Sequence, residues 1–442
     1  MENLSAATKE ELIAIIEALL VRVGELEEEV RRLRAGKGGG TALAVKPSRP
    51  EREQKERKHR DRAFVRRREP ATEEVRHVVE RCPDCGRSLH GGWEHARRQV
   101  IEVVLQRRVI DHVIWARRCG VCRKRILPKL EPSEIGVQGQ RRFGASVQSL
   151  VASLHIGCRA PMRMIGKLMW ELFELRVSEG EVVKLLDGLK EAGEPGLQQL
   201  LGEIRASSSV CADETGWRQN GDNGYLWGFF SEGARYFEYR KSRSAQVPEE
   251  ILGEDFGGTI TCDFYAAYNK LGALQRCWFH LLKDARELAE INADQPEVGE
   301  WVEALKALYE EAKACDLALG ELPANCRARR KERRRFERLA AQLARPYAKD
   351  PDAPQRVLAH RILKHLPELF VFISDPAVPA TNNLAERSLR PAVIARKISG
   401  GTRSPKGSAT RMGLMSLFDT WRAQSKGQLQ GCRELLLPTP AP

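Results

Sequence analysis

The fold of this 442-residue chain is decided by four stretches rich in β-branched, aromatic and small residues: Ser208-Ser-Val-Cys-Ala-Asp213, Tyr225-Leu-Trp-Gly-Phe-Phe230, Tyr236-Phe-Glu-Tyr-Arg240 and Gly258-Thr-Ile-Thr-Cys-Asp263. Each of them predicts a β-strand. Loops containing Asn220-Gly221 and Glu232-Gly233 join the first three, which predicts antiparallel neighbours. Helical sequence follows the fourth from Ala266. We therefore expect a meander followed by strand–helix alternation.

Two aspartates stand at the ends of these strands. Asp213 ends the first, and Asp263 ends the fourth. In the fourth strand Ile260 and Cys262 face one side, so Asp263 lies on the other, polar side. The strand order matches the ribonuclease H-like fold, in which two such aspartates lie on adjacent strands. Glu214 would point to the opposite face from Asp213.

A third acid, Glu386, lies in a predicted short helix that begins near Thr381 and stops at Pro391. Arg390 is one turn away on the same face. The carboxylate could bind a metal ion, while Arg387 and Arg390 could meet phosphate. A single acidic residue is more often a solvated surface group, so this prediction depends on the three acids together.

Charge and length set the wider frame. The net charge is +13, which favours a polyanionic partner such as nucleic acid, although a merely basic protein is the alternative. No stretch reaches the roughly 18 apolar residues that a membrane span needs, so we expect no membrane partner. Acidic residues interrupt the apolar ones near the N-terminus, which argues against a signal peptide. We expect an intracellular, cytoplasmic protein with about three structural units.

Residues 8–35 predict a coiled coil. Apolar residues alternate at spacings of four and three, with β-branched residues at a and Leu at d: Leu12, Ile16, Leu19, Val23, Leu26, Val30 and Leu33. This pattern favours a parallel homodimer. The alternative is an amphipathic helix that docks on its own chain.

Residues 36–75 predict a basic linker, because Gly36 to Gly40 break the helix and residues 46–68 are crowded with Lys and Arg. This linker is either ordered on DNA or a solvated tether.

Residues 76–130 predict a zinc ribbon. Its two Cys-x-x-Cys knuckles offer four thiolates to one structural Zn²⁺: Cys82, Cys85, Cys119 and Cys122. Disulfides or free thiols are the alternatives.

Strand-like sequence at 99–115 would fill this ribbon. The other cysteines, including Cys277, read as ordinary buried residues.

Residues 140–205 predict short helices in a helix-turn-helix-like, DNA-binding arrangement, in which the third helix begins at Ser178. A packed helical connector is the alternative reading of this region.

The chain between Asp263 and Glu386 is longer than the fold needs, which predicts a helical insertion at 285–375. Its basic run favours contact with DNA, although a solvated helix face is the alternative. A second basic stretch, rich in Gly, could approach the scissile backbone or form a plain surface turn. The candidate DNA-binding residues of these two stretches are Arg329, Arg330, Arg333, Arg334, Arg396, Lys397 and Arg403.

Three motifs resemble transposases of insertion-sequence family 66: Asp213-Glu-Thr-Gly-Trp217, Cys277-Trp-Phe-His280 with Arg286, and Thr381-Asn-Asn-Leu-Ala-Glu-Arg-Ser-Leu-Arg-Pro391 followed by Arg396-Lys-Ile-Ser-Gly-Gly-Thr-Arg403. The resemblance covers roughly residues 8–425. It implies a multidomain α+β protein, whose ribonuclease H-like catalytic domain spans 206–425 and carries the insertion. Phe279-His280-Leu281-Leu282 departs from the family pattern, so His280 could contact DNA, join the metal shell or be a buried structural residue.

The resemblance also implies a DDE triad at Asp213, Asp263 and Glu386, holding two Mg²⁺ (or Mn²⁺) ions. The implied reaction is phosphodiester cleavage at transposon ends, followed by strand transfer into target DNA. The implied partners are both DNAs and accessory proteins of the element, in a prokaryotic, nucleoid-associated setting. Two alternatives remain: a DNA-binding repressor or end-bridging protein with a vestigial catalytic fold, and a nuclease that only hydrolyses.

Overall fold

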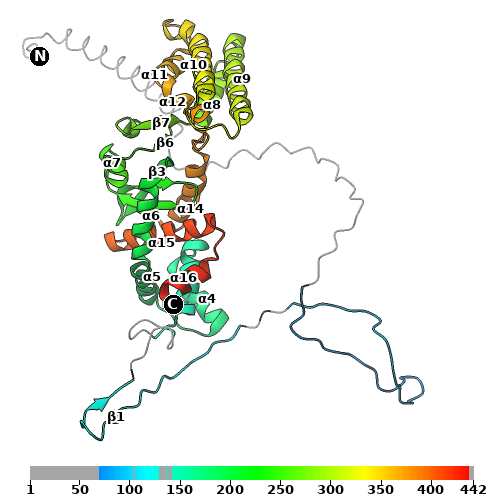
Figure 1. Ribbon diagram of the computed structural model, residues 1–442. Helices are drawn as coiled ribbons and strands as arrows, with labels where there is room; N and C mark the ends of the chain where they lie inside the picture. The colour runs from blue at the N-terminus through cyan, green and yellow to red at the C-terminus, as the bar shows by residue number, and fades with distance from the viewer. Residues whose placement is uncertain (1–68, 102, 104, 129–135, 137–141, 438–442) are drawn as a thin grey trace, which may run out of the picture. The chain divides into compact units, whose positions relative to one another are not determined.

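The computed structural model describes residues 69–101, 103, 105–128, 136 and 142–437 (Figure 1). It divides into two units, Met1–Glu102 and Val103–Pro442, and each is treated by itself. The predicted coiled coil and the basic run at 46–68 lie outside the described residues.

A five-stranded mixed sheet forms the centre of the second unit, in the order β5-β4-β3-β6-β7. Its strands are β3 (Ser209–Gln219), β4 (Asp222–Phe230), β5 (Arg235–Arg240), β6 (Thr259–Cys262) and β7 (Ala273–Arg276). β3, β4 and β5 pair antiparallel, which confirms the predicted meander. Asn220 and Gly221 take positive φ angles of 55° and 91° in the tight turn between β3 and β4.

Two strand predictions differ from the structure. β3 continues six residues past Asp213 to Gln219, because β4 offers it a paired partner along its whole length. After Asp263 the chain forms only a single 3₁₀ turn, η3 (Ala266–Tyr268), before β7. β7 pairs parallel with β6 and buries Leu274, so tertiary pairing replaces the helix that the sequence suggested.

Helices from both ends of the second unit share one hydrophobic core with the sheet. Those that precede the sheet in sequence are α3 (Ala145–Ala152), the π-helical turn η2 (Ser153–Gly157), α4 (Met162–Phe173), α5 (Glu179–Ala192) and α6 (Glu194–Ala206). Those that follow its first strands are α7 (Gln246–Leu252), α14 (Asn383–Ser399), α15 (Pro405–Ala423) and α16 (Gln428–Leu436). α16 packs on α3 and α5, so the end of the chain closes the core of its first helices (Figure 1).

The predicted entry to α5 is confirmed. The Ser178 hydroxyl accepts the backbone N–H of Glu181 (3.2 Å), and the Glu181 carboxylate accepts the backbone N–H of Ser178 (2.8 Å). This reciprocal pair is a capping box, which satisfies donors that a helix start otherwise leaves open.

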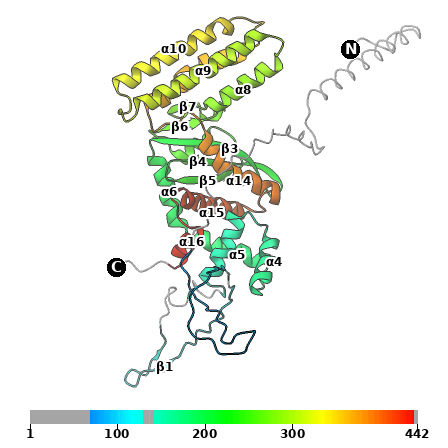
Figure 2. The same ribbon diagram turned by 90° about the vertical axis from the view of Figure 1, so that its right-hand side faces the viewer.

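A second hydrophobic core is made entirely of helices that lie between β7 and α14 in sequence. They are α8 (Trp278–Ile291), α9 (Pro296–Leu319), α10 (Arg327–Ala348), α11 (Arg356–Lys364), α12 (Leu366–Leu369) and α13 (Val371–Ser374). Figure 2 shows the long helices α8, α9 and α10 beyond the β7 edge of the sheet. Trp278 stacks on Tyr309 at 4.9 Å and links α8 to α9.

The expectation that Pro391 stops the helix carrying Glu386 is wrong. α14 runs through Pro391 to Ser399 and ends at Gly400 in the left-handed conformation. Ala392 and Ala395 are buried, and burial of this apolar face keeps the helix intact beyond the proline.

The strands expected at 99–115 are absent from the described part of that range. A short hairpin forms afterwards from β1 (Arg117–Arg118) and β2 (Arg125–Ile126), around the second Cys-x-x-Cys knuckle. Within the described residues, no helix is both long and apolar enough to cross a membrane.

Candidate active site

Asp213 and Asp263 belong to neighbouring strands. β3 runs parallel to β6, with Cys211 opposite Thr261. Extending this register by two residues on each strand brings Asp213 opposite Asp263. Parallel strands advance by the same distance per residue, so residues an equal number of positions further along stay opposite each other. The two carboxylates therefore lie near each other.

The backbone at Asp263 is fixed from two sides. Its Oδ1 accepts the backbone N–H of Tyr265 (2.9 Å), which closes a tight turn. The fully buried guanidinium of Arg276 donates to the Asp263 carbonyl (2.7 Å) and is paired with Glu368 (2.5 Å). Asp263 is thus presented by rigid backbone at the end of β6.

The pKa of the Asp213 carboxyl is raised by its surroundings, which include other acids. Burial raises the pKa of its carboxyl to about 8, and the negative charges of Glu214, Asp263 and Glu386 contribute to the rise. The backbone N–H of Glu214 donates to Asp213 Oδ1 (2.9 Å) and opposes the rise in pKa. A nearby cation would stabilise the ionised form, since opposite charge lowers the pKa of a carboxyl.

A buried asparagine anchors the helix that carries Glu386 beside this region. Asn382, fully buried just before α14, donates from Nδ2 to the carbonyl of Ala212 (2.8 Å). Its backbone N–H donates to Sγ of Cys277 (3.1 Å). These two bonds hold the start of α14 against β3 and the start of α8. Glu386, in the first turn of α14, is consequently placed beside the strand that carries Asp213.

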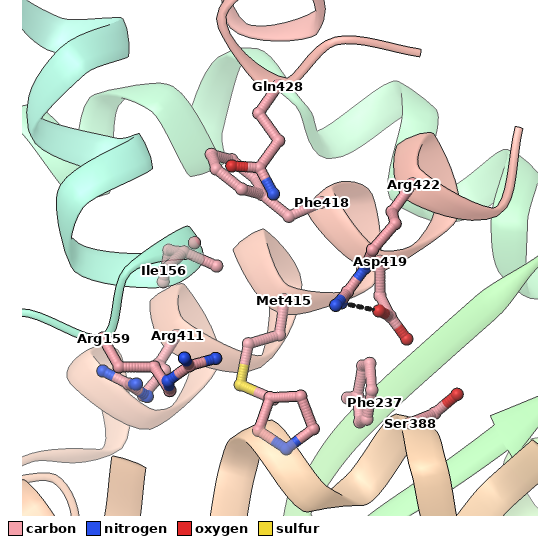
Figure 3. A pocket seen from close by; sticks show the side chains of 12 residues that line it. Ile156, Arg159, Phe237, Ser388, Arg411, Met415, Phe418, Asp419, Arg422 and Gln428 are labelled. Carbon is pink, nitrogen blue, oxygen red and sulfur yellow. Dashed lines mark hydrogen bonds and ion pairs between the residues drawn. The ribbon is translucent and has the colours of Figure 1, made fainter. Parts of the chain in front are cut away.

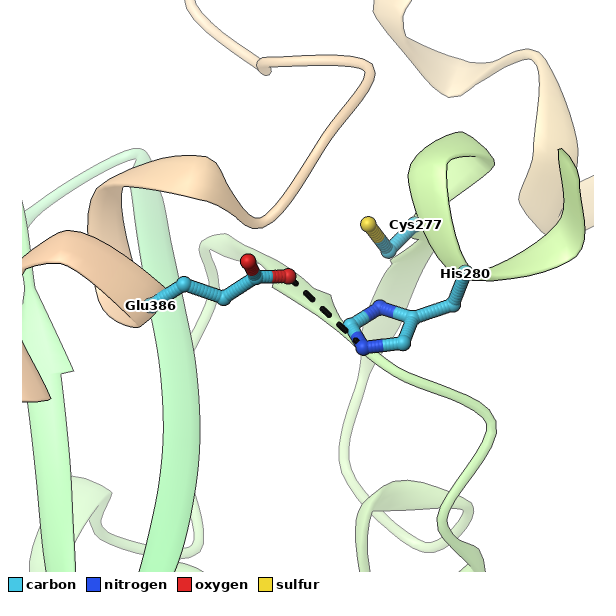
Figure 4. Close-up of side chains that lie close together, drawn as sticks. All are labelled: Cys277, His280 and Glu386. Carbon is cyan, nitrogen blue, oxygen red and sulfur yellow. Dashed lines mark ion pairs between the residues drawn. The ribbon is translucent and has the colours of Figure 1, made fainter. Parts of the chain in front are cut away.

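Cys277, His280 and Glu386 form the one close group of metal-type ligands found among the described residues. One ligand atom from each lies within 4.8 Å of the others, and His280 Nε2 is 3.6 Å from Glu386 Oε1. Figure 4 shows the Glu386 carboxylate directed at the imidazole, with the Cys277 thiol beside the ring. Asp213 and Asp263 are not members of this tight group.

Sequence reasoning missed Cys277. The available signal was the Cys-x-x-His spacing at a helix start, which puts the sulfur at the N-cap of α8 and the imidazole in its first turn. Burial raises the pKa of the Cys277 thiol, while the backbone N–H groups of Asn382, His280 and Phe279 act in the opposite direction.

Glu214 serves a different role from its neighbour. Its carboxylate is buried and accepts hydrogen bonds from Arg243 (2.6 Å) and from the Tyr268 hydroxyl (2.7 Å). These hydrogen bonds hold the Glu214 side chain between β3 and the chain that follows β6.

The basic loop after α14 is tied to the end of β3. The Thr402 N–H donates to the Arg218 carbonyl (2.9 Å), and the Asn220 N–H donates to the Thr402 carbonyl (2.8 Å). Arg396 is half-buried and donates to the Gly216 carbonyl. The other basic residues expected to meet DNA here are exposed: Arg387, Arg390, Lys397 and Arg403.

The helical insertion corrects one DNA-binding prediction. Arg329 has 0% exposure and donates to the carbonyls of Gly320, Leu322 and Ile373 as well as to Asp316. Helical periodicity directs the Arg329 side chain toward the core. There it holds the α9–α10 loop and α13 together. Arg330 and Arg334 are exposed, and Arg333 is half-buried with bonds to Glu337 and the Pro367 carbonyl.

Each cysteine knuckle forms a tight turn closed by backbone hydrogen bonds. The Cys82 N–H donates to the Arg87 carbonyl (2.9 Å), and the Cys119 N–H donates to the Lys124 carbonyl (2.9 Å). Backbone N–H groups of the following residues lower the pKa of the Cys82 and Cys119 thiols. Donation of this kind favours the thiolate, which is the form that binds Zn²⁺.

A separate cavity lies between η2, β5, α14 and α15 (Figure 3). Arg411 lines it, and burial lowers the pKa of this guanidinium to about 10. Arg411 donates to Nε2 of His155 (2.8 Å), and burial likewise lowers the pKa of this imidazole, to about 4. None of the three predicted catalytic acids lines this cavity, so it is distinct from the acidic site.

A comparison with models of protein families identifies the family of this chain. The family model described as "Transposase IS66 family" matches residues 140–410, which include the sheet, the helical insertion and all three acids. No curated protein sequence matches the chain.

Proposed function

The chain belongs to the IS66 family of transposases, and on this premise we propose that it cleaves DNA at transposon ends and joins them to target DNA at Asp213, Asp263 and Glu386. The observation that carries the proposal is that β3 and β6, the strands that lead to Asp213 and Asp263, are parallel neighbours, while Asn382 bonds the start of the Glu386 helix to Ala212 of β3. Burial and the charges of Glu214, Asp263 and Glu386 raise the pKa of Asp213, so a bound cation would favour its ionised form.

Oxygen-rich carboxylates fit Mg²⁺ or Mn²⁺, the hard ions of phosphoryl transfer. Two such ions would be held by Asp213, Asp263 and Glu386, and when bound they would stabilise the attacking and leaving oxygens at phosphorus. Asp213, on whose carboxyl the charges of both other acids act, would be a ligand of these ions.

The chain's own groups then position the DNA. The sheet order β5-β4-β3-β6-β7 supports a ribonuclease H-like catalytic domain, because two acids come from adjacent central strands and the third from a later helix. Arg387 and Arg390 follow Glu386 on exposed turns of α14 and would meet phosphates beside the scissile bond. Lys397 near the end of α14 and Arg403 in the loop pinned to β3 would lie along the same DNA backbone.

Further parts of the protein would recruit and order the DNA. Arg330, Arg333 and Arg334 of the insertion would contact transposon ends, as would the helices of residues 140–205. A structural Zn²⁺ on Cys82, Cys85, Cys119 and Cys122 and a homodimer through residues 8–35 complete the proposed assembly.

The decisive experiment incubates the full chain with DNA carrying the element's ends, a target plasmid and Mg²⁺. Strand transfer products support a transposase. Nicking without joining would indicate a hydrolytic nuclease, and binding without cleavage would indicate a repressor or end-bridging protein.

Asp213→Asn should abolish cleavage and joining while DNA binding persists. Asp294→Asn, an exposed aspartate of the insertion, is the matched control and should react like the wild type. Cleavage by Asp213→Asn at the wild-type rate would overturn the assignment of this residue.

Replacing Arg330 and Arg334 together by Ala tests the insertion. For each phosphate that the double variant no longer neutralises, the log–log salt slope of binding should fall by roughly 0.9 on duplex DNA. An unchanged slope would remove these residues from the DNA-binding surface.

A further inference from the structure

Next to the proposed magnesium ligands lies a second group of potential metal ligands, made by Cys277, His280 and Glu386. Within the described residues, Glu386 Oε1 is buried and makes no hydrogen bond, and His280 Nε2 lies 3.6 Å from it. Leaving a buried carboxylate oxygen without a hydrogen bond costs free energy, so this atom marks a place where a bound cation would be favourable.

We propose that Cys277, His280 and Glu386 form a binding site for a thiophilic divalent cation such as Zn²⁺, which shares Glu386 with the catalytic magnesium site. One thiol, one imidazole and one carboxylate make a softer donor set than Mg²⁺ prefers, and they suit Zn²⁺ or Co²⁺. Three protein ligands leave one tetrahedral position open.

The spacing between the imidazole and carboxylate donors is close to what such an ion requires. Bonds of about 2.1 Å to nitrogen and oxygen at a tetrahedral angle separate the two ligand atoms by about 3.4 Å. His280 Nε2 and Glu386 Oε1 are 3.6 Å apart, so little movement is needed.

The backbone holds the ligands in place before any ion binds. The Cys277 N–H donates to the Cys262 carbonyl (2.9 Å), and the Trp278 N–H donates to the Ala380 carbonyl (3.1 Å). The start of α14 is fixed by the Asn382 bonds to Ala212 and to the Cys277 sulfur. Preorganisation of this kind favours binding, since little conformational entropy is lost.

Sharing Glu386 has a regulatory consequence, and only this consequence rests on the proposed function. A Zn²⁺ ion held by Cys277 and His280 would compete with magnesium for the Glu386 carboxylate and would place a second positive charge beside it. Zn²⁺ would therefore act as an inhibitor that Mg²⁺ relieves by competition.

Co²⁺ titration of the full-length, metal-free protein without DNA tests the site. Wild-type protein should bind one more Co²⁺ equivalent with thiolate-to-cobalt absorption than Cys277→Ser or His280→Ala, whose affinity there should fall at least about 100-fold. Cysteines elsewhere bind Co²⁺ equally in all three proteins, so the difference reports this site. Equal stoichiometry and equal spectra in wild type and Cys277→Ser would overturn the proposal.

Two matched variants complete the design. Cys432→Ser replaces a buried cysteine of α16 and should keep the additional equivalent. Asp213→Asn should also keep it, although it loses DNA cleavage, so a failed cleavage assay does not decide the metal result. Thermal melts confirm folding of each variant, and His280→Ala decides if Cys277→Ser does not fold.

Competition tests the shared carboxylate without measuring activity. Millimolar Mg²⁺ should weaken Co²⁺ binding at this site in the wild type and weaken it less in Asp213→Asn. Equal weakening in both proteins would refute the link to the magnesium site.

Discussion

Replacing Asp213 by Asn should stabilise the metal-free protein at neutral pH. Burial and neighbouring acids raise the pKa of the Asp213 carboxyl from 3.8 to about 8. Between these two values the folded protein keeps a proton that the unfolded chain has released. Stability therefore falls as the pH rises from about 4 to about 8, and this contribution is constant above and below that window.

The magnitude follows from the part of this window below pH 7. Roughly three pKa units at about 1.36 kcal/mol each set an upper limit of about 4 kcal/mol on the penalty. Local hydration of a partly exposed carboxylate reduces it, so we expect Asp213→Asn to gain about 1–3 kcal/mol. With an unfolding entropy near 2.1 cal/mol/K per residue over roughly 340 residues, the melting temperature should rise by about 1–4 °C.

Differential scanning fluorimetry in chelator at pH 4.5 and pH 7 would measure this effect. The gain should be large at pH 7 and fall to roughly a quarter of that value at pH 4.5, where Asp213 is protonated in the folded wild type but largely ionised in the unfolded chain. Asp294→Asn controls for the loss of one negative charge and should show no such pH dependence. Mg²⁺ should stabilise the wild type and not Asp213→Asn.

Two results would refute this reasoning. Equal stabilisation at both pH values would mean that packing, rather than charge, distinguishes the variant. No stabilisation at pH 7 would mean that burial and the neighbouring charges do not raise the pKa of the Asp213 carboxyl.

Three further predictions concern stability, each read from the melting temperature and from chemical denaturation. Arg329→Ala should lower the free energy of unfolding by about 3–5 kcal/mol, because it leaves buried carbonyls and Asp316 without their partner, whereas exposed Arg330→Ala should change it by less than about 0.5 kcal/mol. If the two variants melted alike, the buried role of Arg329 would be wrong. Asn382→Ala should cost about 1–3 kcal/mol, because the Ala212 carbonyl loses its donor, and a neutral result would mean that α14 is not anchored there. Gly401→Ala should destabilise the basic loop by at least about 1 kcal/mol, because Gly401 has a φ of 115° and an added Cβ would collide with the Arg218 carbonyl; a wild-type melt would contradict the pinning of this loop to β3.

The sequence by itself determined the local elements whose signals are short-range. Alternating strand residues with Asn220-Gly221 between them specified the meander, and Ser178 with Glu181 specified the start of α5. The end of the fourth predicted strand also marked Asp263, whereas Asp213 lies within β3 rather than at its end. These features depend on residues close in the chain, where periodicity and turn chemistry act directly.

Tertiary structure alone decided the features that depend on distant partners. β7 exists because β6 offers it an edge, and α14 continues past Pro391 because its far half is buried. Arg329 reads as one more basic residue in a charged run, yet burial against α13 makes it structural. Cys277 and Glu386 are separated by more than a hundred residues, and their helix starts are joined by bonds from Asn382 to the Cys277 sulfur and from Trp278 to the Ala380 carbonyl. Local sequence fixes which side chains a strand or helix presents, whereas packing of remote segments fixes which of them meet.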